Sequence, residues 1–89
     1  MNYEVVLTPQ AESLLTQLWL SGRDHEALRE ALEQANQKLA TDPLNAGESR
    51  SGDRRILFAD PLALTFSVSQ PERLVRILFV SRTRMRLGR

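Results

Sequence analysis

Along the first part of the chain, the spacing of apolar residues changes from a strand period to a helical period. Residues 2–7 (NYEVVL) alternate between two faces, which predicts a β-strand. Thr8 is a favourable N-cap and Pro9 suits the first helical position, so a helix is expected to follow. Its apolar stripe consists of Ala11, Leu14, Leu15, Leu18 and Trp19. Gly22 is expected to end this helix in the left-handed conformation.

A second helical stripe follows after a short link. Asp24 is a second N-cap candidate, and Pro43 ends the helix because the residue before a proline is pushed out of the helical region. The stripe between them consists of Leu28, Ala31, Leu32, Ala35 and Leu39. Two apolar stripes joined by so short a link predict an antiparallel helical hairpin.

The second half of the chain predicts three strands. Residues 44–53 are a polar loop, and strands are expected at 54–59, 62–69 and 74–82, separated by turns at Asp60–Pro61 and at QPER. In the middle strand Leu62, Leu64, Phe66 and Val68 face inward, and Ala63, Thr65, Ser67 and Ser69 face outward. The last strand is apolar on both faces in its middle, which is typical of a central position in a sheet. The three phenylalanines, Phe58, Phe66 and Phe79, are assigned to strand cores or edges, with no ligand.

These elements give an α+β fold. The order is β-α-α-β-β-β, with the helical hairpin packed on one face of a mainly antiparallel four-stranded sheet, and residues 1–89 are expected to form one domain. The other face of the sheet is then open. Its small outward residues and the arginines of neighbouring strands suggest a shallow, arginine-rimmed groove for a phosphodiester chain or a peptide. The alternative is an ordinary solvated sheet face.

Charge separates the two halves of the chain. Residues 1–49 carry a net charge of −5 and residues 50–89 carry +6, and the whole chain has eleven arginines against one lysine. Arginine matches the geometry of phosphate and carboxylate, so the second half suggests an anionic partner, unless its arginines are simply a solvated face.

Without cysteine there is no disulfide, thiolate nucleophile or cysteine-type zinc site, and we expect no metal and no cofactor. The N-terminus lacks the pattern of a signal peptide and no apolar run is long enough to span a membrane, so a cytoplasmic location is expected.

The element order resembles the RelE/ParE superfamily, the toxins of bacterial type II toxin–antitoxin pairs. Three segments carry the resemblance over essentially the whole chain: the entry YEVVLTPQAESLLTQLW, the helix exit LATDP, and the strand pattern R-x-L-x-x-x-P-L-x-L-x-F-x-V followed by R-x-V-R-I-L-x-V. These motifs are strand and turn patterns, not a catalytic signature. The resemblance implies growth inhibition, a role in plasmid stabilisation, and an antitoxin whose C-terminal segment wraps the toxin, partly as a helix and partly as an added strand.

The resemblance implies one of two targets. RelE-like members cleave messenger RNA on the ribosome, and ParE-like members poison DNA gyrase. RNA cleavage requires a base, an acid and cations around the phosphate. The weak catalytic candidates are Glu48, Arg54, Arg82 and Arg84, and the residues expected to bind the target are Arg50, Arg54, Arg55, Arg73, Arg76, Arg82, Arg84 and Arg86.

Two positions depart from the nuclease pattern of the family. Ala63 stands where RelE-like ribonucleases carry a strand arginine, and Arg84 and Arg86 stand where they carry a tyrosine or a histidine–tyrosine pair. His25 is expected at the surface and Tyr3 in or beside the core. An arginine binds phosphate but transfers protons poorly near neutral pH.

Three hypotheses remain open at this point. The first is a toxin that acts by tight binding to the ribosome or gyrase through its arginine-rich sheet and tail, and that an antitoxin neutralises. The second is a weak ribosome-dependent endoribonuclease. The third is a degenerate, non-toxic binding module of the same fold. The basic tail, residues 82–89, is expected to be a phosphate-seeking arm or a segment that an antitoxin orders.

Overall fold

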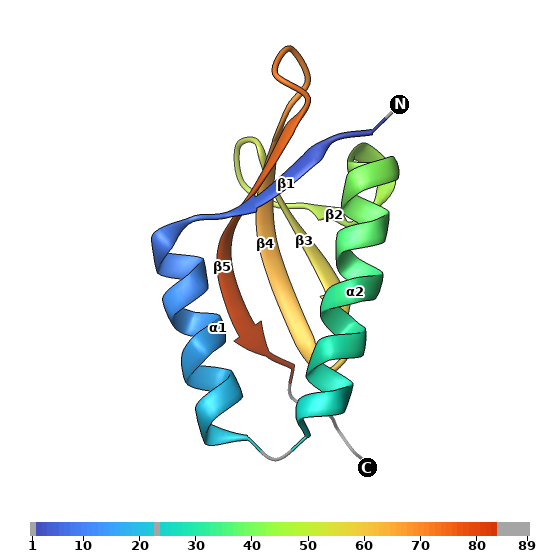
Figure 1. Ribbon diagram of the computed structural model, residues 1–89. Coiled ribbons are helices and arrows are strands. Elements are labelled where there is room, and N and C mark those ends of the chain that lie inside the picture. The colour runs from blue at the N-terminus through green and yellow to red at the C-terminus, as the bar shows by residue number, and fades with distance from the viewer. Residues whose placement is uncertain (1, 23, 84–89) are drawn as a thin grey trace.

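The computed structural model describes residues 2–22 and 24–83, and these form two helices and five strands (Figure 1). The α+β order predicted from the sequence is confirmed, with one additional short strand in the loop between the second helix and the next long strand. In chain order the elements are β1 (Glu4–Leu7), α1 (Pro9–Ser21), α2 (His25–Thr41), a 3-10 turn (Pro43–Asn45), β2 (Glu48–Ser49), β3 (Arg54–Ala59), β4 (Leu62–Ser69) and β5 (Leu74–Arg82).

The five strands form one mixed sheet in the order β1-β5-β4-β3-β2. Only β1 and β5 run parallel, and the other three pairings are antiparallel. The strand β5 is an interior strand, paired on both sides by β1 and β4, so the central position predicted from its apolar character is confirmed only in that sense, and β4 is the middle strand of the five. The count of four strands was one too low, because β2 is only two residues long and too polar to show a strand pattern.

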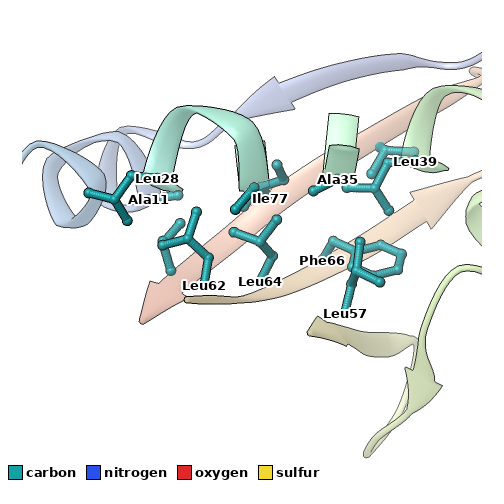
Figure 2. Packing of buried hydrophobic residues seen from close by; sticks show 12 residues of the cluster. Ala11, Leu28, Ala35, Leu39, Leu57, Leu62, Leu64, Phe66 and Ile77 are labelled. Carbon is teal, nitrogen blue, oxygen red and sulfur yellow. The ribbon is translucent and has the colours of Figure 1, made fainter. Parts of the chain in front are cut away.

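Both helices cover the same face of the sheet (Figure 1). Helix α1 packs mainly on β5, and α2 packs on β1, β3 and β4. The predicted stripes of both helices lie in the core or against it, together with the inward residues of β4. Figure 2 shows Phe66 between the helix layer and β3, close to Leu39 and Leu57, and Phe66 has no exposed surface. No helix of the described residues lies on the opposite face of the sheet.

The two helices begin and end for different physical reasons. Thr8 caps α1 as predicted, because its hydroxyl accepts a hydrogen bond from the backbone N–H of Ala11 at 3.2 Å. Gly22 ends α1 in an extended conformation with φ −101°, so the left-handed ending expected from the sequence was wrong. Asp24 occupies the N-cap position of α2, but its carboxylate makes no capping bond and is held instead by Arg82.

An irregularity in the pairing of β4 and β5 decides which way the end of β5 faces. Phe66 pairs with Ile77, whereas the preceding Thr65 pairs with Phe79, so Leu78 is an extra residue without a partner in the ladder. Such a bulge reverses the alternation of side chains beyond it. Phe79 therefore points away from the helices, and Arg82 points toward them.

Candidate functional site

The open face of the sheet carries three rows of side chains that cross β3, β4 and β5. Directly paired residues on neighbouring strands point to the same side, so the register gives the membership of each row. The rows are Arg54, Ser67 and Arg76; Ile56, Thr65 and Phe79; and Phe58, Ala63 and Ser81. The middle strand thus supplies a floor of small residues, as the sequence predicts. We call the surface formed by these nine residues the open face.

Two aromatic side chains on the open face are exposed. Phe58 on β3 is 52% exposed and Phe79 on β5 is 45% exposed, whereas Phe66 is fully buried on the other side of the sheet. The assignment of all three phenylalanines to strand cores or edges was therefore wrong for Phe58 and Phe79. The alternation from Arg54 through Ile56 to Phe58 was a signal for the first, but nothing in the sequence reveals the bulge that turns Phe79 outward.

The arginines predicted to surround this face divide between the two sides of the sheet. Arg54 and Arg76 lie on the open face, where they flank Ser67. Arg76 makes only a long ion pair of 3.8 Å with the exposed Glu72. Arg54 has no ion pair within residues 2–22 and 24–83.

Arg55 and Arg82 lie on the helix side, so their predicted placement around the open face was wrong. Arg55 pairs with the buried Phe66 and donates hydrogen bonds to the carbonyl oxygen of Gly47 and the hydroxyl of Ser49, both at 3.2 Å. These bonds tie the β2 segment to β3. Their cause is the strand alternation, which places every second residue of β3 on the core side.

Arg82 is bound by the start of α2. Its two terminal nitrogens donate to the two carboxylate oxygens of Asp24 at 3.1 and 3.2 Å, a fork-to-fork pair between residues 58 positions apart in sequence. The hydrogen bond from Arg82 lowers the pKa of the Asp24 carboxyl, and the same bond raises the pKa of Arg82. Arg82 is therefore engaged by its own chain in this structure.

The remaining predicted arginines lie elsewhere. Arg50 follows β2 and pairs with Glu48 at 3.4 Å, with both side chains exposed. Arg73 lies in the turn between β4 and β5, where its guanidinium stands 5.4 Å from the centre of the Tyr3 ring. Arg84, Arg86 and the rest of the tail beyond residue 83 lie outside the described residues. Their expected roles stay predictions.

Groups that could transfer a proton are nearly absent from the open face in the described part of the chain. His25 lies at the helix tips, stacked on Trp19 with ring centroids 4.2 Å apart, and Tyr3 lies beside Arg73 and the core. Glu48 pairs with Ile56 and so faces the same side as the open face, at the β2 edge. Of the three catalytic candidates within residues 2–22 and 24–83, Glu48 and Arg54 lie on this side and Arg82 does not; the Glu48 side chain is 67% exposed and paired with Arg50. No group of three potential metal ligands occurs among residues 2–22 and 24–83.

A second surface feature lies on the helix side. A cavity of about 320 Å³ opens between α1 and α2 and reaches down to the sheet. Leu15 of α1 and Leu32 of α2 form its walls, Leu64 and Ile77 its base, and Val5 and Leu7 of the edge strand β1 its end. We call this feature the helix groove. The residue pattern does not predict this groove, because each apolar stripe by itself predicts only helix packing.

Solved structures of toxin–antitoxin systems share this architecture. The chain superimposes on the toxin–antitoxin complex RelBE2 from Mycobacterium tuberculosis with a TM-score of 0.77, 21% identity and 93% of each chain covered. It has the RelE/ParE fold.

Two further structures with the RelE/ParE fold match over nearly the whole chain. The chromosomal ParDE system from P. aeruginosa matches with a TM-score of 0.71 and 20% identity, covering 92% of this chain and 97% of that one. An archaeal RelE–RelB complex from Pyrococcus horikoshii OT3 matches with a TM-score of 0.64 and 17% identity, covering 92% and 96%. No protein-family model matches the sequence, and no curated protein does. No helix among the described residues is long and apolar enough to cross a membrane.

Proposed function

We propose that this protein is the toxin of a type II toxin–antitoxin pair and that an antitoxin segment neutralises it by occupying the helix groove. The observation that carries the proposal is the combination of an apolar groove with an edge strand beside it. Leu15 and Leu32 are only partly buried in the free chain, and Leu7 of β1 is 38% exposed at the end of the groove. An amphipathic helix can fill such a groove, and the free side of an edge strand can accept an added strand.

The proposal draws further support from the fold. Three structures that share it are of the toxin–antitoxin complex RelBE2, the ParDE toxin–antitoxin system and a RelE–RelB complex. The shape of the groove agrees with an antitoxin that binds partly as a helix and partly as a strand. Both parts of such a segment would lie within one continuous surface, because Val5 and Leu7 belong to the edge strand and to the groove at once.

We further propose that the toxin acts by binding its target through the open face, and that it cleaves no RNA efficiently. The open face offers Arg54 and Arg76 as cations and Phe58 and Phe79 as apolar contacts, while the rings of His25 and Tyr3 lie elsewhere. In the described part of the chain the groups near this face that could serve as a base are carboxylates, namely Glu4 and Glu48 on the outer strands β1 and β2 and Glu72 beside Arg76, and no histidine or tyrosine faces them as an acid. Binding needs none of these proton-transfer groups, whereas cleavage of a phosphodiester does.

The test of the antitoxin site is co-expression of the chain with the protein encoded by the neighbouring gene. Leu15→Glu and Leu32→Glu each place a charge in the helix groove and are expected to abolish rescue of growth. Leu20→Glu is the matched control, because Leu20 is on the same helix as Leu15 but is 78% exposed and does not line the groove. Rescue that survives both groove variants would refute the proposed antitoxin site.

The mode of action is tested by expressing the chain alone and following growth, the 5′ ends of cellular messages and DNA breaks. Growth arrest without codon-phased cuts in messages is the expected result, and accompanying DNA breaks would identify gyrase as the target. Arrest with codon-phased cuts would replace the binding mode by ribosome-dependent cleavage. Normal growth would favour a non-toxic binding module of the same fold.

A further inference from the structure

We propose that Arg29 and Glu33 of α2 determine, through their opposite charges, which helix the helix groove accepts. The occupant that they select is an amphipathic helix with one acidic and one basic side chain, about one turn apart, beside its apolar stripe. This inference rests on the proposed role of the groove as a partner-binding site. It adds the residues that distinguish between partners of the same apolar shape.

The helix groove has one apolar wall and one charged wall. From α1 it receives Leu15, whereas α2 contributes Leu32 together with Arg29, Glu33 and Asn36. Among the described residues that line the groove, Arg29 and Glu33 are the charged ones, and both are exposed. The apolar wall and the base can therefore bind any apolar stripe of suitable size, and discrimination by charge falls to the α2 wall.

The charges of Arg29 and Glu33 are available to a partner. Neither side chain makes an ion pair or a side-chain hydrogen bond within residues 2–22 and 24–83. The two residues are four positions apart on one helix, but an arginine that precedes a glutamate is the less favourable order for an ion pair along a helix. A partner can therefore pair with both charges without first breaking a contact, unlike at Arg82, which Asp24 already holds.

The positions of the two residues along α2 set the spacing and the order of the complementary charges. Four residues of an α-helix rise about 6 Å, so a helix that packs along α2 faces both charges with residues three or four positions apart. The backbone N–H of Tyr3 donates to the carbonyl oxygen of Ala40 at 2.7 Å, which places the C-terminal end of α2 beside the start of β1. The basic residue of the occupant should therefore lie nearer to β1, opposite Glu33, and the acidic residue nearer to the link between the helices, opposite Arg29.

The apolar part of the groove is long enough for such a helix. A smaller hollow of about 220 Å³ shares Leu15 and Leu32 with the helix groove and extends it to Trp19. On the opposite wall, the distance from Arg29 to Asn36 is about 10 Å along α2. The occupant therefore needs about two to three helical turns.

The two charges contribute selectivity more than affinity. An exposed ion pair stabilises a complex only slightly, whereas two like charges brought together at an interface oppose binding. An occupant with matched charges should therefore bind roughly 3- to 30-fold more tightly than one with the same apolar stripe and two like charges.

The experiment measures the binding of three labelled synthetic peptides by fluorescence anisotropy. Each is an amphipathic helix of about five turns with the same leucine stripe. At two positions four residues apart, the first carries a glutamate and a lysine, the second two glutamates and the third two lysines. The wild type should bind the mixed peptide most tightly. Arg29→Glu leaves two acids on the wall and should prefer the two-lysine peptide, whereas Glu33→Arg leaves two cations and should prefer the two-glutamate peptide.

Salt and matched variants separate a charge effect from a change in the fold. Each preference should be roughly 3- to 30-fold at about 50 mM salt and should shrink at about 500 mM, because salt screens exposed charges. Glu30→Arg and Lys38→Glu change the charge of exposed residues on the same helix that do not line the groove, and they should leave the preference for the mixed peptide unchanged. Leu32→Glu should abolish binding of all three peptides, which would place them in the groove, and Leu20→Glu should not.

Three results would overturn the proposal: no peptide bound by the wild type below about 1 mM, the same order of preference in the wild type, Arg29→Glu and Glu33→Arg, or an equal change of preference in the two control variants. If Leu32→Glu abolishes antitoxin rescue but the charge variants alter no preference, the selectivity proposal is wrong and the proposed antitoxin site stands. If the charge variants change the preference as expected but rescue survives Leu32→Glu, the antitoxin proposal is wrong and the groove selects a different helical partner.

Discussion

The three phenylalanines provide a direct test of which side of the sheet faces the core. Phe66 is fully buried, while Phe58 and Phe79 are 52% and 45% exposed on the opposite side. Truncating a buried phenylalanine to alanine removes its transfer free energy and leaves a cavity, at a cost of about 3 to 5 kcal/mol. The same change at a half-exposed position leaves no cavity, because water fills the space, and we expect a cost of about 1 kcal/mol or less.

These costs are large compared with the stability of so short a chain. At about 0.05 to 0.15 kcal/mol per residue, 89 residues have a free energy of unfolding of about 4 to 13 kcal/mol. The entropy of unfolding of such a chain, about 0.19 kcal/mol per kelvin, converts 1 kcal/mol into a shift in Tm of about 5 °C. Phe66→Ala should therefore lower Tm by about 15 to 25 °C, and Phe58→Ala and Phe79→Ala by about 5 °C or less.

Urea unfolding followed by far-ultraviolet circular dichroism gives the three free energies of unfolding. Fluorescence of Trp19, the single tryptophan, provides a second probe at the helix tips, and coincident transitions justify a two-state treatment. If Phe58→Ala or Phe79→Ala costs as much as Phe66→Ala, the open face is covered in the folded protein. In that case the proposed action through this face loses its basis.

Two further predictions concern the Asp24–Arg82 ion pair and the turn at Gly52 before β3. Because the bond from Arg82 lowers the pKa of Asp24 below its ordinary value of 3.8, this carboxylate stabilises the fold at pH values above 3.8, and the contribution is lost as the pH falls through the lowered value. The wild type should therefore have a higher urea midpoint than Asp24→Asn at pH 6.5, and the difference between the two midpoints should shrink as the pH falls below 3.8; a difference that stays constant with pH would contradict this. Gly52 has φ +66° with no atom within 4 Å of an added Cβ, so Gly52→Ala should cost about 1 to 2 kcal/mol through backbone conformation alone. Gly52→Asn should cost less in the same thermal unfolding experiment, and equal losses for the two variants would point to a different cause.

Much of the fold follows from residue spacing because it depends on local patterns. The stripe from Ala11 to Trp19, the alternation of β4 and the Thr8 cap each specify an element through neighbours within a few positions, and the structure confirms them. The two-residue strand β2 was missed because nothing in its own sequence predicts a strand. It becomes a strand only by pairing with Arg55 and Ile56 of β3 in the folded protein.

The functional sites were less predictable than the fold. Which face of the sheet the side chains at the end of β5 point to depends on one bulged residue, Leu78. Without the bulge at Leu78, strict alternation from Arg76 would turn Phe79 toward the helices and Arg82 to the open face. With it, Phe79 is exposed on the open face and Arg82 binds Asp24.

The sequence by itself therefore determined the order of elements, the inner and outer residues of β4, and the concentration of arginine in the second half. Only the tertiary structure decided which arginines share a surface, that two phenylalanines lie among them, and that the helices leave a groove between them. The physical reason is that spacing along a chain fixes the local period of a strand or helix, whereas a bulge, a register and a gap between helices arise from contacts between segments far apart in sequence.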